Sequence, residues 1–145
     1  HKILGSTPTL ALLDAIDDEY SGSRRSGLLT QNFEYKNVPF WVEHIAPQEL
    51  RKWASDLRTW NVKPEDVQSR KHVLSNLSVL PREINEKSHY KKYSEKRQIA
   101  LDSVDSMGTK LQDWTANDQW TPLMIDERTT EMIDKLIKRW PDPSS

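Results

Sequence analysis

Histidines and acidic residues are the side chains here that could do chemistry, and their spacing limits which chemistry that is. The four histidines are far apart, and none is followed by a second metal ligand three or four residues further on: His1, His44, His72 and His89. Glu43 precedes His44, but the rest of a zinc-protease motif is missing. Acidic pairs such as Asp17 with Asp18 are ordinary on helix surfaces. The sequence therefore predicts no metal site and no catalytic residue.

Other reaction types lack their usual sequence features. The chain has no cysteine, which excludes disulfides, thiolate metal sites and a cysteine nucleophile. Of its four glycines, three lie within the first 27 residues, so a glycine-rich loop around a nucleotide phosphate is not expected. Neither a nucleophile elbow nor a kinase motif set is present. We expect a protein without a cofactor and without an enzymatic role.

The most suggestive polar stretch is 82–97, with six Lys or Arg against three Glu and two interleaved tyrosines. Lysine and arginine can reach phosphates, while tyrosine can stack on a base, so this stretch is compatible with a nucleic-acid surface. Mixed Lys and Glu is also the usual composition of a solvated helix face. Under the nucleic-acid alternative, the contacting residues are Lys87, Tyr90, Lys91, Lys92, Tyr93, Lys96 and Arg97.

Hydrophobic periodicity predicts the elements that carry these residues. The clearest helix is 47–60, where Leu50, Trp53 and Leu57 lie on one apolar stripe and Asn61 suits a left-handed cap. Four further helical stretches are expected, 8–20, 64–80, 82–114 and 122–140, with a weak point at Gly108 in the stretch 82–114. The segment 28–40 lacks helical periodicity and is expected to be extended or a short hairpin. The predicted fold class is all-α, a compact helical domain of about five helices.

The core and the partner surface are both predicted from large apolar side chains. The core is expected to contain Trp53, Leu57, Leu74, Val104, Leu111, Ile133 and Leu136. With six tryptophans and only 35% hydrophobic residues, the chain has more aromatic anchors than a small core needs. We expect four of them to be partly exposed around an apolar groove that accepts a helix or peptide of another protein: Trp41, Trp114, Trp120 and Trp140. The function predicted first is therefore a protein-interaction or scaffolding domain, with nucleic-acid binding as the alternative.

Length and charge set the remaining expectations. At 145 residues, the sequence predicts a single domain over 8–140 and a short tail over 141–145. Since the chain begins at His1 rather than Met, we expect part of a longer protein, with residues 1–7 disordered or foreign to it. The formal charge of −1 favours neither nucleic acid nor an acidic surface layer as the partner. No stretch is long and apolar enough for a membrane span, and the absence of cysteine favours an intracellular protein.

Overall fold

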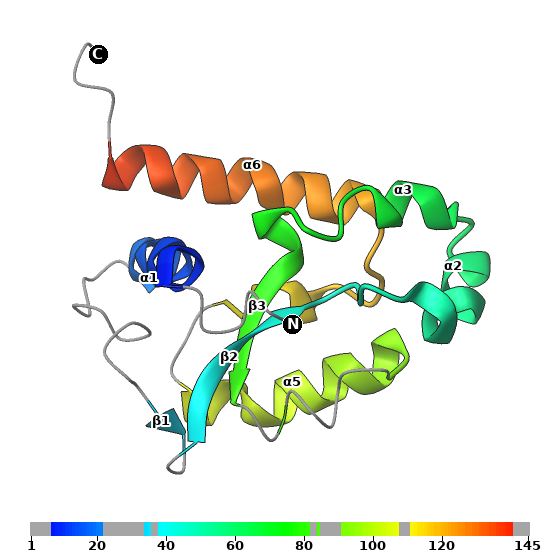
Figure 1. Ribbon diagram of the computed structural model, residues 1–145, viewed down its shortest axis with the longest axis horizontal. Helices are drawn as coiled ribbons and strands as arrows, with labels where there is room; N and C mark the ends of the chain where they lie inside the picture. The colour runs from blue at the N-terminus through cyan, green and yellow to red at the C-terminus, as the bar shows by residue number, and fades with distance from the viewer. Residues whose placement is uncertain are drawn as a thin grey trace.

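The computed structural model describes residues 7–21, 34–35, 38–81, 84, 91–107 and 111–140. Most of this part of the chain is helical, but it also contains a three-stranded antiparallel sheet of order β1-β2-β3, so the fold is not all-α. The strands are β1 (Glu34–Tyr35), β2 (Val38–His44) and β3 (Leu77–Pro81). In Figure 1 the β2–β3 ladder runs between two long helices, α6 (Pro122–Arg139) and α5 (Tyr93–Met107).

The sheet is the main departure from the predicted fold. Strand β1 and the start of β2 lie in the segment expected to be extended, and β2 then continues to His44. Its partner β3 comes from the stretch 64–80 that was predicted as helix. Leu77 pairs with His44, and Val79 and Leu80 are fully buried on opposite faces of the strand. A strand buried on both faces has a continuous apolar sequence, which periodicity cannot distinguish from a buried helix.

The clearest predicted helix is real but shorter than expected. A 3₁₀ turn, η1 (Leu50–Trp53), leads into α2 (Ala54–Thr59), and Asn61 follows with φ 57°, the left-handed conformation expected at that position. Pro47 is not a first helical residue, because the backbone just before it is bonded elsewhere. The amide and carbonyl of Ala46 both bond the side chain of Asn76, so this segment cannot join the helix.

The other helices follow the predictions to different degrees. Helix α1 (Thr7–Ser21) matches the expected 8–20, and α6 begins after Thr121, whose side chain accepts from the amide of Met124. Helix α3 (Pro64–Gln68) is cut short because the following residues lead into η2 (Leu74–Asn76) and β3. Helix α5 starts at Tyr93 rather than Arg82 and ends one residue before Gly108, and the predicted 82–114 helix is replaced at its end by η3 (Asp113–Ala116).

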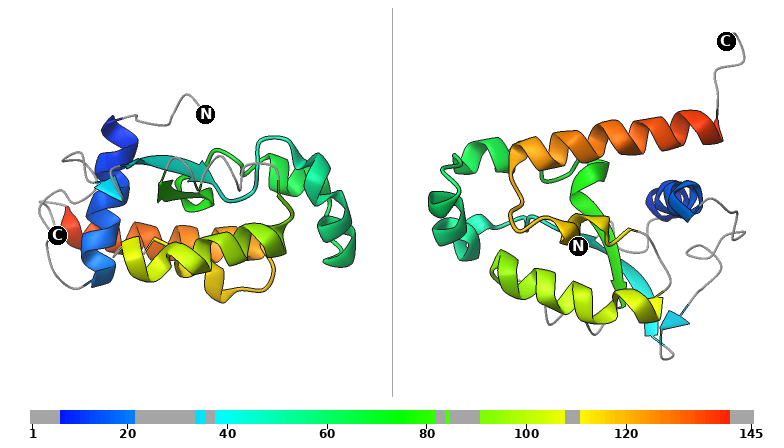
Figure 2. Two further views of the ribbon diagram at one scale, coloured as in Figure 1. Left: turned by 90° about the horizontal axis from the view of Figure 1, so that it is seen from below. Right: turned by 180° about the vertical axis from the view of Figure 1, so that it is seen from behind.

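The core is built around a row of aromatic rings. Trp53, Tyr93, Trp114 and Trp120 are buried, and each ring contacts the next with centroids 5.5, 5.9 and 6.2 Å apart. The row joins η1, α5, η3 and the approach to α6, while α1 packs against α6 and crosses it in Figure 2. The first turn of α5 reaches the end of β2 through Lys96, whose ammonium group donates to the carbonyl of His44.

The predicted core is confirmed in part. Trp53, Leu57 and Leu111 are buried, and Leu74 and Leu136 are partly buried against them. Ile133 is 50% exposed, so its place in the core was wrong, and the side chain of Val104 lies outside the described residues. Residues 1–6 and 141–145 also lie outside them, and the single domain over 8–140 stays a prediction. In the described part of the chain, the helices are all too short or too polar to traverse a lipid bilayer.

Candidate functional site

Two histidines separated by 28 residues meet at the end of β2. Nε2 of His44 lies 3.3 Å from Nδ1 of His72, and the two rings stand edge to face at 75°. His44 is only 8% exposed, whereas His72, in the loop before η2, is exposed to solvent. A hydrogen bond between two imidazole nitrogens needs one ring to donate and the other to accept. The pair therefore couples a nearly buried imidazole to one at the surface.

A buried lysine holds the backbone beneath His44. The ammonium group of Lys96, on α5, donates to the carbonyl of His44 at 2.6 Å and to the carbonyl of Ile45 at 2.9 Å. It also lies 2.7 Å from Oε1 of Glu43, and both side chains of this ion pair are almost completely buried. Two of its three N–H donors thus bond backbone carbonyls, and the carboxylate of Glu43 supplies the opposite charge.

A buried asparagine holds the same segment from the other side. Oδ1 of Asn76 accepts from the amide of Ala46 and from the indole of Trp120, at 2.9 and 3.0 Å. Its Nδ2 donates to the carbonyls of Ala46 and Lys71, and its own carbonyl accepts from the amide of Ile45. These bonds use both donors and both lone pairs of the side-chain amide. Between them, Lys96 and Asn76 bond every backbone polar group of Ile45 and Ala46.

The chemistry available at this strand end is that of imidazole. Imidazole gains and loses a proton near neutral pH, acts as a general base and can ligate a metal ion. No group of three or more His, Cys, Asp or Glu that could hold a metal ion occurs in the described part of the chain. The arrangement is therefore suited first to proton transfer by a rigidly placed imidazole.

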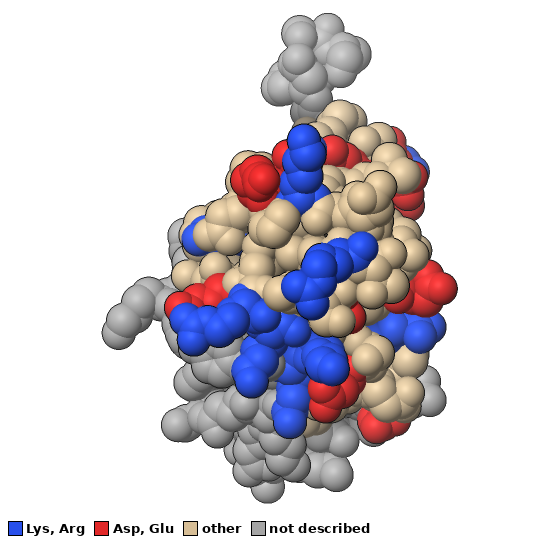
Figure 3. Space-filling view, turned by 90° about the vertical axis from the view of Figure 1, so that its right-hand side faces the viewer, with Lys and Arg blue, Asp and Glu red and all other residues tan. Residues whose placement is uncertain are grey.

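Cations gather on the face shown in Figure 3, which contains η1, α2 and the start of α5. We call the exposed cations of η1, of α2 and of the two residues that precede α5 the basic face: Arg51, Lys52, Arg58, Lys91 and Lys92. The elements are joined directly. The indole of Trp53 donates to the carbonyl of Lys91, and the amide of Tyr93 donates to Asp56. Lys91 and Lys92 are thus fixed beside η1 and α2, one helical turn from Lys96.

The residues predicted under the nucleic-acid alternative do not form one surface. Lys91 and Lys92 are exposed, but Lys96 is 0% exposed and cannot touch a phosphate in this arrangement. Tyr93 is 1% exposed and donates through its hydroxyl to the carbonyl of Asn117, so it is not available to stack on a base, and burial raises its pKa. Arg97 is half-buried and donates to the carbonyl of Thr115. Lys87 and Tyr90 lie outside the described residues.

The tryptophans predicted to surround a partner groove do not lie together on the surface either. Trp114 and Trp120 are buried in the aromatic row, where their indole N–H groups donate to Gln112 and Asn76. The expectation of partial exposure was wrong for these two, since the core uses them to connect η3 and α6 to the sheet. Trp140 is 57% exposed at the end of α6, and the side chain of Trp41 lies outside the described residues.

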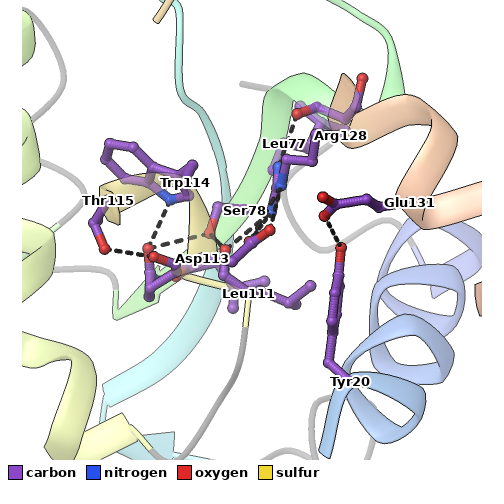
Figure 4. Close-up of polar contacts among 12 residues, drawn as sticks. Tyr20, Leu77, Ser78, Leu111, Asp113, Trp114, Thr115, Arg128 and Glu131 are labelled. Carbon is purple, nitrogen blue, oxygen red and sulfur yellow. Dashed lines mark hydrogen bonds and ion pairs between the residues drawn. The ribbon is translucent and has the colours of Figure 1, made fainter. Parts of the chain in front are cut away.

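A second polar cluster surrounds Arg128 of α6 (Figure 4). The guanidinium group is buried, and its N–H groups donate to the carboxylate of Asp113 and to three backbone carbonyls, those of Ser75, Leu77 and Leu111. A pocket of about 290 Å³ opens beside it. Because all its donors are used within the protein, Arg128 ties η2, β3 and η3 together and has none left for a ligand.

Comparison with known protein families gives a match over most of the chain. Residues 8–135 match the family described as the C-terminal domain of GmrSD restriction endonucleases. The chain belongs to this family. No curated protein and no solved structure matches it.

Membership of the GmrSD C-terminal domain family corrects the predicted function. The expectation of a non-catalytic protein-interaction or scaffolding domain is wrong, because the family is one of restriction endonucleases, a class of enzymes that act on DNA. The expectation that no enzymatic role exists is overturned by the same finding. Of the two partner classes considered, nucleic acid is the one this family supports, and a protein partner is not supported.

Sequence reasoning treated His44, Asn76 and Lys96 as unrelated. Signals for two of them were present but weak. His44 ends a strand-like run of β-branched and aromatic residues, and Asn76 is the largest polar residue in the mainly apolar stretch 73–80. Lys96 gave no signal, because a lysine surrounded by charged residues is ordinarily at the surface.

Proposed function

We propose that this GmrSD C-terminal domain hydrolyses phosphodiester bonds of DNA, with His44 as the general base. The observation that carries the proposal is an imidazole at the end of β2 whose backbone is bonded on both sides, by Lys96 and by Asn76. A proton acceptor must be held within hydrogen-bonding reach of the attacking water, and this rigid placement supports that role. Family membership supplies the substrate class.

The proposed reaction needs a base for the attacking water and a proton for the leaving oxygen. The oxygen of water forms a bond to phosphorus while the bond from phosphorus to the leaving sugar oxygen breaks. His44 takes the proton from the water, and the leaving oxygen takes a proton from solvent. Nε2 of His44 lies within hydrogen-bonding distance of Nδ1 of His72, so the tautomers of the two rings depend on each other.

The basic face supports the binding part of the proposal. Three of its cations lie on η1 and α2, and the other two directly precede α5, the helix whose Lys96 holds the end of β2. Lysine and arginine contacts to phosphates fix the register of a protein on DNA without reading its sequence. Lys91 and Lys92 are the two residues of the predicted nucleic-acid stretch that take part in this surface.

The catalytic role is tested by cleavage of supercoiled plasmid DNA. We expect His44→Ala to lower the cleavage rate at least about 100-fold, the usual contribution of a positioned general base. Its melting temperature should stay close to that of the parent, because Lys96 and Asn76 bond the backbone of 44–46 and not the imidazole. Reactions are run with MgCl2, MnCl2 or EDTA, since phosphoryl-transfer enzymes often hold a divalent ion with few protein ligands. Equal cleavage by parent and His44→Ala in every buffer contradicts the proposal.

The binding role is tested by titrating a labelled DNA duplex at several salt concentrations. Each phosphate contact contributes about −0.9 to the slope of log affinity against log salt. Replacing Lys91 and Lys92 by Ala should therefore weaken binding and flatten that slope by about 2. Lys138→Ala is the matched control, because this exposed lysine lies near the end of α6, outside the basic face. An unchanged slope in the double variant rules out the basic face as the phosphate contact.

A further inference from the structure

We infer that Lys96 is a positioning residue for His44, acting through the backbone carbonyls of His44 and Ile45. The inference rests on the proposed function and adds a residue to it. Lys96 does not face the solvent or the basic face. It connects helix α5 to the last residues of β2, and its contacts determine where the imidazole is held.

The burial of Lys96 requires an explanation, because taking an ammonium group out of water is unfavourable unless its charge and all its donors are satisfied. Glu43 supplies the counter-charge at 2.7 Å. A buried ion pair seldom stabilises a fold more than well-packed apolar side chains of the same size would. Stability alone therefore gives little reason for this pair, whereas its other two contacts have a specific geometric effect.

Those two contacts fall where the sheet stops. The β2–β3 register ends with His44 opposite Leu77, so no strand residue pairs with the chain beyond that point. The ammonium group of Lys96 accordingly bonds the carbonyl of the last paired residue and the carbonyl of the next one. Asn76 bonds the amides and the remaining carbonyl of the same segment from the opposite side. Together they fix the backbone angles on which the direction of the His44 imidazole depends.

The position of Lys96 on α5 also connects the two parts of the proposed site. Its amide donates to the carbonyl of Lys92 in the first turn of the helix. Lys92 belongs to the basic face, so the same helix end carries a phosphate contact outside and the support of the general base inside. Misplacement of a reacting group by about 1 Å can cost about 100-fold in rate. Loss of the Lys96 contacts should therefore lower the rate of the chemical step more than the affinity for DNA.

Two neutral replacements of the ion pair separate positioning from simple stability. The double variant E43L/K96M fills the space with apolar side chains and removes every donor to the two carbonyls. The double variant E43Q/K96Q also removes both charges but keeps amide donors at position 96. Lys138→Met is the matched control, because it removes a lysine from an exposed ion pair with Asp134 on α6. Plasmid cleavage is measured as kcat and KM for each protein, together with its melting temperature.

We expect E43L/K96M to be folded, with kcat reduced about 100-fold and KM changed less than about threefold. The kcat of E43Q/K96Q should be at least about tenfold higher than that of E43L/K96M, and the kcat of Lys138→Met should equal that of the parent. Equal kcat in E43L/K96M and the parent overturns the inference. So does an equal loss in both double variants, or a loss that parallels the melting temperatures, because each outcome would show a role in stability only.

A second measurement does not depend on DNA cleavage. Amide hydrogen exchange of Ile45 and Ala46, and the ring nitrogen NMR signals of His44, report the strand end directly. Both should change in E43L/K96M and change less in E43Q/K96Q. If the parent does not cleave DNA, the proposed function fails, but these signals still decide whether Lys96 positions His44. If E43L/K96M does not fold, the amide hydrogen exchange rates of Ile45 and Ala46 in E43Q/K96Q decide whether Lys96 positions the strand end. Exchange rates equal to those of the parent overturn the inference.

Discussion

Lys96 and Arg128 are two buried cations that make the same kinds of contact in different regions of the molecule. Each pairs with one carboxylate and spends its other donors on backbone carbonyls, Lys96 at the end of β2 and Arg128 around η2, β3 and η3. The difference lies in what the bonded backbone carries. At Lys96 the bonded backbone carries His44, a side chain that can exchange protons, whereas the carbonyls that Arg128 bonds belong to Ser75, Leu77 and Leu111.

This difference separates a supporting contact from a functional one. A guanidinium group with five donors can join several segments at once, which suits a role in holding the fold together. An ammonium group has only three donors, and the contacts of Lys96 all fall in one short segment at the end of β2. The effect of Lys96 is therefore confined to that place in the chain. We therefore expect loss of Arg128 to appear mainly as lost stability, and loss of the Lys96 contacts mainly as lost activity.

The largest effect is expected from Arg128→Met. This change removes a donor from three carbonyls, of which that of Leu111 is also bonded by Ser78, and takes the ion-pair partner from Asp113. Breaking a buried charge network in this way costs about 3–5 kcal/mol, a large part of the stability of a small domain. Denaturant unfolding followed by tryptophan fluorescence measures the change, with Lys138→Met as the exposed control. A decrease of less than about 1 kcal/mol in the free energy of unfolding would contradict the expectation that Arg128 serves mainly stability.

An intermediate effect is expected from Asn76→Ala. The alanine leaves the amide and the carbonyl of Ala46 buried without side-chain partners, at a cost of about 1–3 kcal/mol for an unsatisfied group. Because Asn76 supports the same segment as Lys96, DNA cleavage should fall more than the change in stability explains. Cleavage assayed well below the melting temperature separates the two effects. Full activity in a folded Asn76→Ala protein would show that the segment needs support from one side only.

The smallest effect is expected at the exposed ion pair of Arg70 with Asp126. The hydrogen bond from Arg70 lowers the pKa of the Asp126 carboxyl. A carboxyl whose pKa is lower in the folded state stabilises the fold above its unfolded pKa of about 4. That contribution is lost as the pH falls through the lower folded pKa.

Both side chains of this pair are solvent-accessible, so the contribution should not exceed about 0.5 kcal/mol. Denaturant unfolding of the parent and of Asp126→Asn should differ by that amount at pH 7 and converge as the pH falls below about 4. A difference that persists at pH 2 would have another cause than the ionised carboxyl.

Local signals in the sequence determined several elements without the rest of the chain. The helices α1 and α6, the Thr121 cap and the left-handed Asn61 depend on residues within one or two helical turns, and all of them are confirmed. Trp53 and Leu57 were placed in the core for the same reason, since one helical stripe of large apolar side chains has to be buried.

Only the tertiary structure decided the sheet and the candidate site. The pairing of β2 with β3 joins residues more than 30 positions apart, and the burial of both faces of β3 removes the alternation that identifies a strand. His44 meets His72 because of that pairing. Lys96 shows the limit most clearly, because its neighbours in sequence are charged and solvated. Its burial is set by acceptors on β2, about 50 residues away, whose positions no local pattern encodes.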